Sequence, residues 1–147
     1  GELDASVLLM PLVGFLEADD ERMRSTIYAI DDELGGGGLI RRWAEEPNGF
    51  LLTSYWMVQC LAKLGEVDRA RERFDQVTAY ANDLGILAEE GEPRTGEPLG
   101  NVPQAFSHVG LINAAWEITM AAWQAEGAIG EGPAHGGGHE HPHEGES

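Results

Sequence analysis

The pattern of apolar and polar positions along the chain predicts five helices. Two of them, residues 20–34 and 66–82, carry apolar side chains at steps of three and four residues, so each should bury one face. The other three, residues 3–16, 50–64 and 103–125, are apolar on nearly every side and should be enclosed by the rest of the protein. Enclosed helices therefore alternate along the chain with helices buried on one side.

This alternation predicts two layers of helical hairpins, with inner helices surrounded by outer ones. Inner helices would run parallel to one another, so their N-terminal ends would share one rim. Two long loops, residues 35–49 and 83–102, precede inner helices and should meet at that rim, where we expect the functional site. Because five helices are too few to close a ring, we expect either part of a larger toroid or an open helical array.

Local signals place several helix ends. Asp19 is the expected N-cap of the second helix, because its side chain can accept from backbone N–H groups of the first turn. Four consecutive glycines, residues 35–38, should end that helix. Pro103 is expected in the first turn of the fifth helix, where a missing N–H costs nothing.

Charge and cysteine content limit the possible partners. The 147 residues include 9 Lys and Arg against 26 Asp and Glu, which gives a net charge of −17. Nucleic acids and anionic membranes must be met with positive charge, so we expect neither as a partner. No apolar run approaches the roughly 20 residues of a membrane span. The single cysteine, Cys60, is expected to be a small core residue, and we expect a cytoplasmic protein.

The five histidines fall into two groups. His108 lies in the apolar fifth helix and is expected to be a hydrogen-bonded core residue. The others lie in residues 127–147, a Gly/His/Glu-rich stretch that we expect to be a disordered tail. Its imidazoles could bind zinc, nickel or copper, but no fold fixes their geometry, so no specific metal site is expected. These four are His135, His139, His141 and His143.

Glutamates in the second long loop are candidates for catalysis. Glu89 follows three apolar residues, 86–88, so its carboxylate should be anchored to the core at the mouth of the helical layers. A carboxylate held there could act as a general base on water. With 26 acidic residues in the chain, the alternative is that Glu89 and Glu90 belong to a solvated loop.

The first long loop offers groups that suit a sugar. Arg42 supplies hydrogen-bond donors, and the indole of Trp43 supplies a flat apolar face. The alternative is an ion pair of Arg42 with Glu45 or Glu46, with Trp43 packed at the rim. Trp56, in the third helix, is by its apolar surroundings more typical of a core residue.

Three segments carry a resemblance to a known family. They are GNVPQAFSHVGLINAA (100–115), ELDASVLLMPLVGFLEADDERMRSTI (2–27) and the stretch from LIRRW to SYWMVQCLAKLG (39–65). Together they resemble glycoside hydrolase family 15, the glucoamylase-like enzymes, which include glucoamylases, glucodextranases and trehalases. The resemblance covers about residues 2–120 and excludes the tail.

The resemblance implies a fold and a set of site residues. The fold is an all-α (α/α)6 barrel, of which residues 1–126 would be the C-terminal portion. The general base of the family, in a motif of the form LL-(S/A)-E-(E/Q), falls on Glu89, and Glu90, its neighbour in that motif, is implied to support the site as a substrate-binding residue. An arginine–aromatic pair that contacts sugar hydroxyls falls on Arg42 and Trp43, and a tryptophan near the pocket falls on Trp56. No cofactor and no metal are implied.

The resemblance also implies an activity, the inverting hydrolysis of α-glucosidic bonds that releases glucose. Glucoamylase-type action on an α-glucoside or α-glucan oligosaccharide is the main expectation, and trehalase is the alternative within the family. One carboxylic acid protonates the glycosidic oxygen while a second carboxylate activates water. The family's acid belongs to an upstream tryptophan–glutamate motif that does not occur in this chain.

We therefore expect the chain to be inactive alone, with the missing N-terminal part of the same polypeptide as its partner. From another functional class, the alternative is a non-catalytic helical interaction module.

Overall fold

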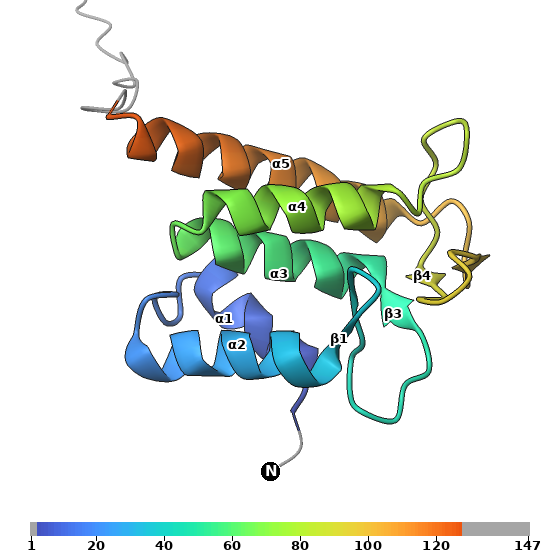
Figure 1. The fold of residues 1–147 in the computed structure, drawn as a ribbon, viewed down its shortest axis with the longest axis horizontal. Coiled ribbons are helices and arrows are strands. Elements are labelled where there is room, and N and C mark those ends of the chain that lie inside the picture. The colour runs from blue at the N-terminus through green and yellow to red at the C-terminus, as the bar shows by residue number, and fades with distance from the viewer. Residues whose placement is uncertain (1–2, 128–147) are drawn as a thin grey trace, which may run out of the picture.

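Helices form the frame of the chain, which the computed structural model describes from residue 3 to residue 127 (Figure 1). A short 3-10 helix, η1, passes directly into the single turn of α1. The elements span the following residues: η1 Ala5–Leu8, α1 Leu9–Leu12, α2 Glu21–Leu34, α3 Leu51–Lys63, α4 Val67–Thr78 and α5 Ala105–Ala125.

Helix α3 lies at the centre of this frame. It packs against α5, α4, α1 and α2, and ten of its 13 residues are buried. The side chain of Tyr55 is fully buried, and its ring centre lies 5.8 Å from that of Phe74 on α4. The prediction of an enclosed helix over residues 50–64 is therefore confirmed. Helices α3 and α5 run in the same direction away from the end where the long loops gather, and α4 runs back (Figure 1).

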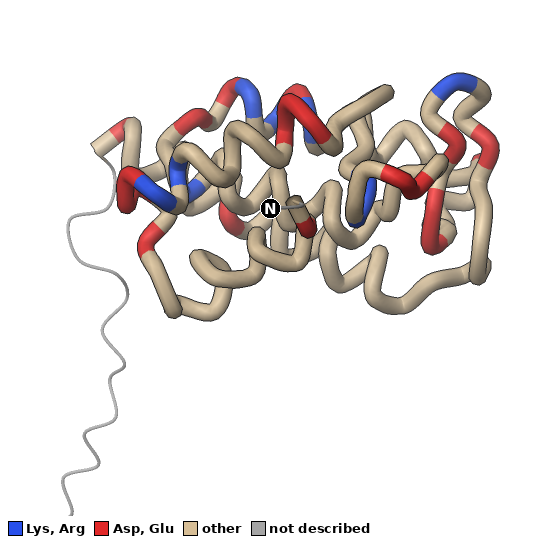
Figure 2. The backbone as a smooth tube through the Cα atoms, turned by 90° about the horizontal axis from the view of Figure 1, so that it is seen from below, with Lys and Arg blue, Asp and Glu red and all other residues tan. Residues whose placement is uncertain are grey.

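Helices α2 and α4 bury one face each and expose charged side chains on the other. Asp31 of α2 pairs with Arg69 and Arg73 of α4, at 2.9 and 2.5 Å, and so ties the two helices together. Charged residues gather on this side of the molecule, whereas the opposite side is nearly free of them (Figure 2). The stripe predicted for the second helix is confirmed by the buried residues of α2, which are Met23, Ile27, Ile30 and Leu34.

The two long loops carry a small antiparallel sheet that the sequence did not predict. Its strands, in spatial order, are β1 Gly35–Gly36, β2 Leu39–Ile40, β3 Gly49–Phe50, β4 Glu90–Gly91 and β5 Pro98–Leu99. Strand β3 of the first loop pairs with β4 of the second, with Phe50 opposite Glu90. The expected meeting of the loops at one rim is confirmed. The expectation of an all-α chain is corrected, because strands of two residues are too short to show an alternating pattern.

Several helix ends differ from the predictions. The apolar stretch 3–16 is divided between η1 and α1 and leaves the helix at Val13. Asp20, rather than Asp19, caps α2 by accepting from a backbone N–H two residues further along, at 3.0 Å. Helix α5 begins at Ala105, so Pro103 precedes its first turn.

Helix α4 ends at Thr78, four residues before the predicted end. The N–H of Ala79 still donates to the carbonyl four residues back, whereas the N–H groups of Tyr80 and Ala81 donate to carbonyls three residues back, as in the tightened last turn of a helix.

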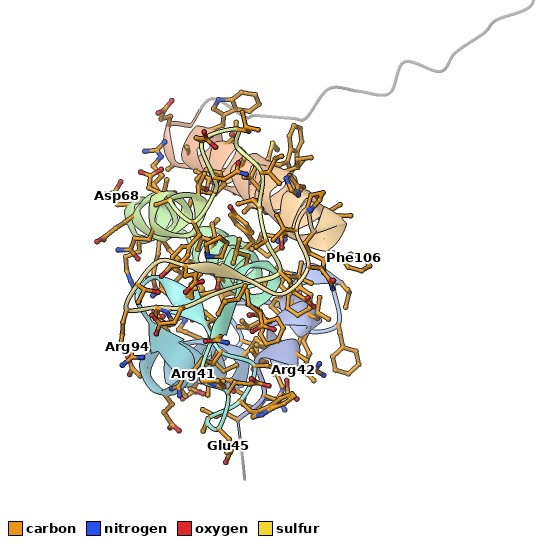
Figure 3. All side chains as sticks on the ribbon, turned by 90° about the vertical axis from the view of Figure 1, so that its right-hand side faces the viewer. Arg41, Arg42, Glu45, Asp68, Arg94 and Phe106 are labelled. Atoms are coloured by element: carbon orange, nitrogen blue, oxygen red, sulfur yellow. The ribbon has the colours of Figure 1, made fainter. Side chains whose placement is uncertain are left out.

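Helix α5 is not enclosed as predicted for residues 103–125. One side, made of mostly small side chains, faces the core, and the other side exposes large apolar side chains. In Figure 3, Phe106 on α5 projects from the molecule on the side opposite to Asp68 on α4. The buried residues are Ser107, Gly110, Ala114 and Ile118. The exposed large apolar residues are Phe106, Val109, Ile112, Trp116 and Trp123.

Two further sequence predictions concern membrane spans and metal sites. No helix within residues 3–127 is both long enough and apolar enough to cross a membrane. The same range contains no group of three His, Cys, Asp or Glu side chains placed to hold a metal ion. The tail with its four histidines lies, apart from Gly127, outside the described residues.

Candidate active site

A cavity of about 330 Å³ opens where the two long loops meet the beginning of α3. Apolar side chains form much of its wall, and the polar groups are a carboxylate, a guanidinium and two hydroxyls. Such a cavity suits a ligand that is uncharged and rich in hydroxyl groups. Three predicted site residues, Arg42, Trp56 and Glu89, lie in this wall together. The complete set of lining residues is Ser6, Leu9, Arg42, Phe50, Leu52, Thr53, Trp56 and Glu89.

Glu89 reaches the cavity from a buried part of the second loop. Leu87 and Ala88, immediately before it, are buried, which confirms the predicted anchor to the core. The Glu89 N–H donates to the Asn101 carbonyl at 3.0 Å, and the Glu89 carbonyl accepts from the Leu51 N–H at 3.1 Å. The backbone of Glu89 is thus fixed between the start of α3 and the end of the second loop.

The Glu89 carboxylate is held at one of its two oxygens. Oε2 accepts from the backbone N–H of Asn101 at 3.2 Å and from Asn101 Nδ2 at 3.0 Å. Within the described part of the chain, no residue donates to Oε1. The carboxylate therefore has one anchored oxygen and one oxygen free to accept a proton.

Arg42 enters the cavity wall from the first loop and pairs with an acid at the start of the chain. Its Nε lies 3.9 Å from Asp4 Oδ1, with both side chains about half exposed. The Ser6 N–H donates to Asp4, and this bond, with a smaller contribution from the Arg42 charge, holds the pKa of Asp4 below its ordinary value. The ion pair with Glu45 or Glu46 considered from the sequence is replaced in this structure by the pair with Asp4.

The first loop owes its position to two hydroxyls of α3 and to a neighbouring arginine. Thr53 Oγ1 donates to the Ile40 carbonyl and Ser54 Oγ accepts from the Ile40 N–H, both at 2.8 Å. Arg41 donates to carbonyls on either side of it, including that of Glu33 at 2.7 Å. Arg41 therefore closes the end of α2, and the next residue, Arg42, is the one that reaches the cavity (Figure 3).

The two remaining predicted residues lie beside the cavity rather than in its wall. Trp43 lies under the guanidinium of Arg42, 5.0 Å from its carbon to the ring centre. Trp43 also lines an adjacent hollow of about 410 Å³. Glu90 accepts from Asn48 Nδ2 at 3.2 Å and so joins the two loops.

His108 is the hydrogen-bonded histidine that the sequence predicted. Its Nδ1 lies 2.7 Å from the Gln104 carbonyl, and its Nε2 accepts from the Leu87 N–H at 3.3 Å. This pattern fixes the neutral tautomer with the proton on Nδ1. His108 thereby holds the segment that leads into Glu89.

A larger hollow, of about 620 Å³, lies at the other end of the molecule, between the start of α4 and the end of α5. Four of its charged side chains pair with one another, in the ion pairs Arg69–Glu66 and Arg71–Asp68. None of the predicted site residues lines it, so the candidate chemistry stays at the rim.

Sequence reasoning missed three polar residues of the site. Ser6 and Thr53 line the cavity, and Asn101 holds Glu89. The Asp-x-Ser spacing at residues 4–6 is a helix-start signal that could have directed attention to the first turn. The sequence around Asn101 is typical of a turn and carries no sign of its partner 12 residues earlier.

Two comparisons with known proteins concern the fold and the family. The fold is similar to that of a solved structure described as "Glycosidase Wild Type", with a TM-score of 0.72 and 22% identity, over 82% of this chain and 37% of that chain. At this identity the similarity concerns the fold alone. The family "Glycosyl hydrolases family 15" matches residues 1–116. The chain belongs to glycosyl hydrolase family 15, which confirms the resemblance seen in the sequence.

The relatives compared with this chain are all named trehalases. The chain is 44% identical over 133 residues to a trehalase of Mycolicibacterium smegmatis and 42% identical over 133 residues to a trehalase of Mycobacterium tuberculosis. A trehalase of Thermoplasma acidophilum is 36% identical over 136 residues. These alignments cover 84%, 84% and 88% of this chain and 20%, 20% and 23% of the relatives. The chain thus spans about a fifth of the length of the relatives it matches.

Proposed function

We propose that this chain is the C-terminal portion, over residues 1–126, of an (α/α)6 catalytic domain that hydrolyses trehalose, with Glu89 as its general base. One observation carries the proposal. A carboxylate with one anchored and one free oxygen shares a rim cavity with Arg42 and Trp56. This arrangement fits a site that binds a neutral sugar and activates water beside it.

Trehalase has more support than glucoamylase-type activity, which was the main expectation from the sequence. The three named relatives, at 36–44% identity, are trehalases. Both activities would use the same base, so the rim cavity does not by itself distinguish them. We therefore take trehalose as the substrate and make glucans a comparison in the experiments.

The reaction follows the inverting scheme for two carboxyl groups. Oε1 of Glu89 takes a proton from water while the water oxygen bonds to one anomeric carbon of trehalose. The bond between that carbon and the glycosidic oxygen breaks, and the oxygen takes a proton from a carboxylic acid contributed from outside this chain. One β-glucose and one α-glucose result; Glu89 then returns its proton to solvent, and the acid takes a proton up from solvent. The two carboxyl groups would lie about 6.5–9.5 Å apart, with water between them.

The other site residues orient the sugar. Arg42 would donate to sugar hydroxyls, and Trp56 would lie against the apolar face of the ring. Trp43 would keep the Arg42 guanidinium in place from below. Glu90 would hold the rim loops together through its bond with Asn48.

The exposed apolar side of α5 supports a larger domain. Phe106 is 66% exposed and Trp116 is 60% exposed, on a helix whose opposite side packs against α3. Helices that precede this segment in an (α/α)6 barrel would cover that side and bring the general acid. A non-catalytic interaction module would also use an apolar surface, but it would have no need of a free carboxylate oxygen in a cavity.

Replacement of Glu89 tests the proposal. In the full-length gene product that contains this segment, Glu89→Gln keeps the size of the side chain and removes the base. We expect kcat on trehalose to fall by about 10²–10⁴-fold with little change in KM. The matched control is Glu97→Gln, at an exposed position of the same loop, which should leave kcat unchanged. Near-normal turnover by Glu89→Gln would disprove the assignment.

The products test the reaction and the substrate. Proton NMR recorded during the first turnovers of trehalose should show α- and β-glucose in equal amounts before they interconvert. Assays with maltooligosaccharides provide the comparison. Rapid release of β-glucose from those, without hydrolysis of trehalose, would favour glucoamylase-type activity instead.

A further inference from the structure

We propose that Asn101 is a positioning residue for Glu89, which anchors Oε2 so that Oε1 faces the reacting water. The inference rests on the proposed role of Glu89 as general base. It assigns a function to the start of the Asn-Val-Pro-Gln-Ala-Phe-Ser-His segment, residues 101–108, which was singled out in the sequence only as a family motif.

Asn101 contacts the carboxylate through two donors that converge on one oxygen. Its backbone N lies 3.2 Å and its Nδ2 lies 3.0 Å from Glu89 Oε2. Two donors on the same oxygen fix the rotation of the carboxylate group and leave the second oxygen for another partner.

Gly100 makes the close approach possible. Its φ of +73° lies in the left-handed region, which side chains rarely adopt. A Cβ at this position would lie 2.9 Å from Glu89 Oε2 and 3.0 Å from Glu89 Cβ. The absence of a side chain at residue 100 therefore lets the Asn101 N–H reach the carboxylate.

The backbone around Glu89 is held by groups other than the Asn101 side chain. His108 Nε2 accepts from the Leu87 N–H at 3.3 Å, and the Leu87 carbonyl accepts from the Gln104 N–H at 2.9 Å. Ser107 Oγ donates to the Ala88 carbonyl at 2.7 Å. The segment that carries Glu89 is therefore fixed by these bonds whatever residue stands at 101.

Because other residues hold the backbone around Glu89, the side chain of Asn101 can be replaced without loosening that backbone. Its replacement removes one donor to the carboxylate and leaves the backbone ladder in place. A residue that only stabilised the loop would lower the unfolding temperature, whereas a positioning residue lowers kcat and changes the pH dependence. The two roles therefore predict different measurements.

The test uses Asn101→Asp and Asn101→Ala in the full-length enzyme, assayed on trehalose. Asp keeps the shape of Asn but puts an acceptor and a negative charge where the donor was. We expect kcat to fall roughly 10- to 100-fold, the size of one charge-assisted hydrogen bond, with KM changed less than about twofold. The acidic limb of the kcat profile should move to higher pH, because a like charge disfavours the ionised base. Asn101→Ala, which adds no charge, should lower kcat with a smaller move of that limb.

Asn82→Asp is the matched control, because it makes the same chemical change in an exposed residue just before the same loop. The Asn82 Oδ1 atom accepts from the N–H groups of Leu84 and Ile86, which an Asp oxygen can also do. This variant should keep the kcat and the pH profile of the wild type. Wild-type kcat and an unmoved acidic limb in both Asn101 variants would overturn the proposal.

A double variant separates this proposal from the one on which it rests. If Asn101 acts through Glu89, Glu89→Gln with Asn101→Asp should turn over no more slowly than Glu89→Gln alone. A further loss in the double variant would overturn the positioning role. If Glu89→Gln is inactive and the Asn101 variants are fully active, the positioning role of Asn101 is disproved and Glu89 remains the base. A fully active Glu89→Gln would disprove both the role of Glu89 as base and the role of Asn101 as its positioning residue.

Discussion

Helices α3 and α5 are both strongly apolar and lie against each other, but they bury different kinds of side chain. Among the buried residues of α3 are large ones such as Leu51, Tyr55 and Leu61. Those of α5 are Ser107, Gly110 and Ala114, with Ile118 as the one large member. The large apolar side chains of α5 are on its other side, and they are exposed.

The contact between the two helices explains this difference. A Cβ added at Gly110 would lie 3.1 Å from the Cβ of Tyr55, which is tighter than ordinary van der Waals contact, so the backbone of α5 approaches α3 closely at this glycine. A surface helix normally turns its bulky apolar side inward and its polar side outward. Helix α5 instead turns its large apolar side chains outward, and within residues 3–127 they are exposed. Two helices of similar apolar character therefore use their side chains differently: the large ones of α3 fill the core, whereas most of the large ones of α5 are exposed.

Alanine substitutions on α3 and α5 should show the largest difference between the two helices. Tyr55→Ala removes a fully buried ring and its bond to Thr78, and should destabilise the 147-residue chain by about 3–5 kcal/mol. Trp116→Ala, on the exposed side of α5, should change the free energy of unfolding by no more than about 0.5 kcal/mol. Urea unfolding followed by circular dichroism measures both. A loss of several kcal/mol for Trp116→Ala would mean that the outer side is already covered in this chain.

Cysteine labelling compares the same two helices without removing any core contact. Burial raises the pKa of Cys60 on α3 to about 12. The thiolate is the reactive form, so a higher pKa lowers the reactive fraction at pH 8. A cysteine introduced at the exposed Asn113 of α5, with Cys60→Ser to isolate it, should have an ordinary pKa near 8.5 and react roughly a thousandfold faster.

In urea the two thiols should react at similar rates, since burial is then lost. Equal rates in the folded chain would contradict the enclosed position of α3. The rate at Cys60 also measures how often the centre of the fold opens.

The sequence predicted those parts of the fold whose periodicity extends over several turns. The stripe from Met23 to Leu34 and the enclosed helix around Tyr55 were found for this reason. Two-residue strands were not found, because their pairing depends on loops brought together by the helices. The outer side of α5 was assigned to the core because periodicity records where apolar residues lie and says nothing of whether a neighbour is present.

The candidate site was only partly predictable. Glu89 was identified by the apolar residues before it and by the family motif, and the structure places it in a cavity with Arg42 and Trp56. Trp43 and Glu90 lie beside that cavity, because alternate residues along a loop point in different directions. Asn101 was missed, since its bond to Glu89 depends on a left-handed glycine that the sequence alone does not reveal.

Enlarging the small side of α5 should have an intermediate effect. Gly110→Leu places a large side chain against Tyr55 and Leu52, where no space exists, and should cost about 1–3 kcal/mol. Asn113→Leu adds a leucine to an exposed position of the same helix and serves as the control, with a change within about 0.5 kcal/mol. Urea midpoints of the two variants measure the difference. Equal midpoints would mean that α5 does not approach α3 as closely as the structure shows.

The smallest expected effect concerns the ion pair between the two helices. Lys63 Nζ of α3 lies 3.3 Å from Glu117 Oε1 of α5, and each side chain is about three-tenths exposed. Because water screens such a pair, Glu117→Gln should cost less than about 1 kcal/mol, and this cost should shrink further in high salt. Urea unfolding at low and at 1 M salt measures both quantities. A cost of several kcal/mol that salt does not reduce would mean that charge, rather than the close fit of Gly110 against Tyr55, holds α5 in place.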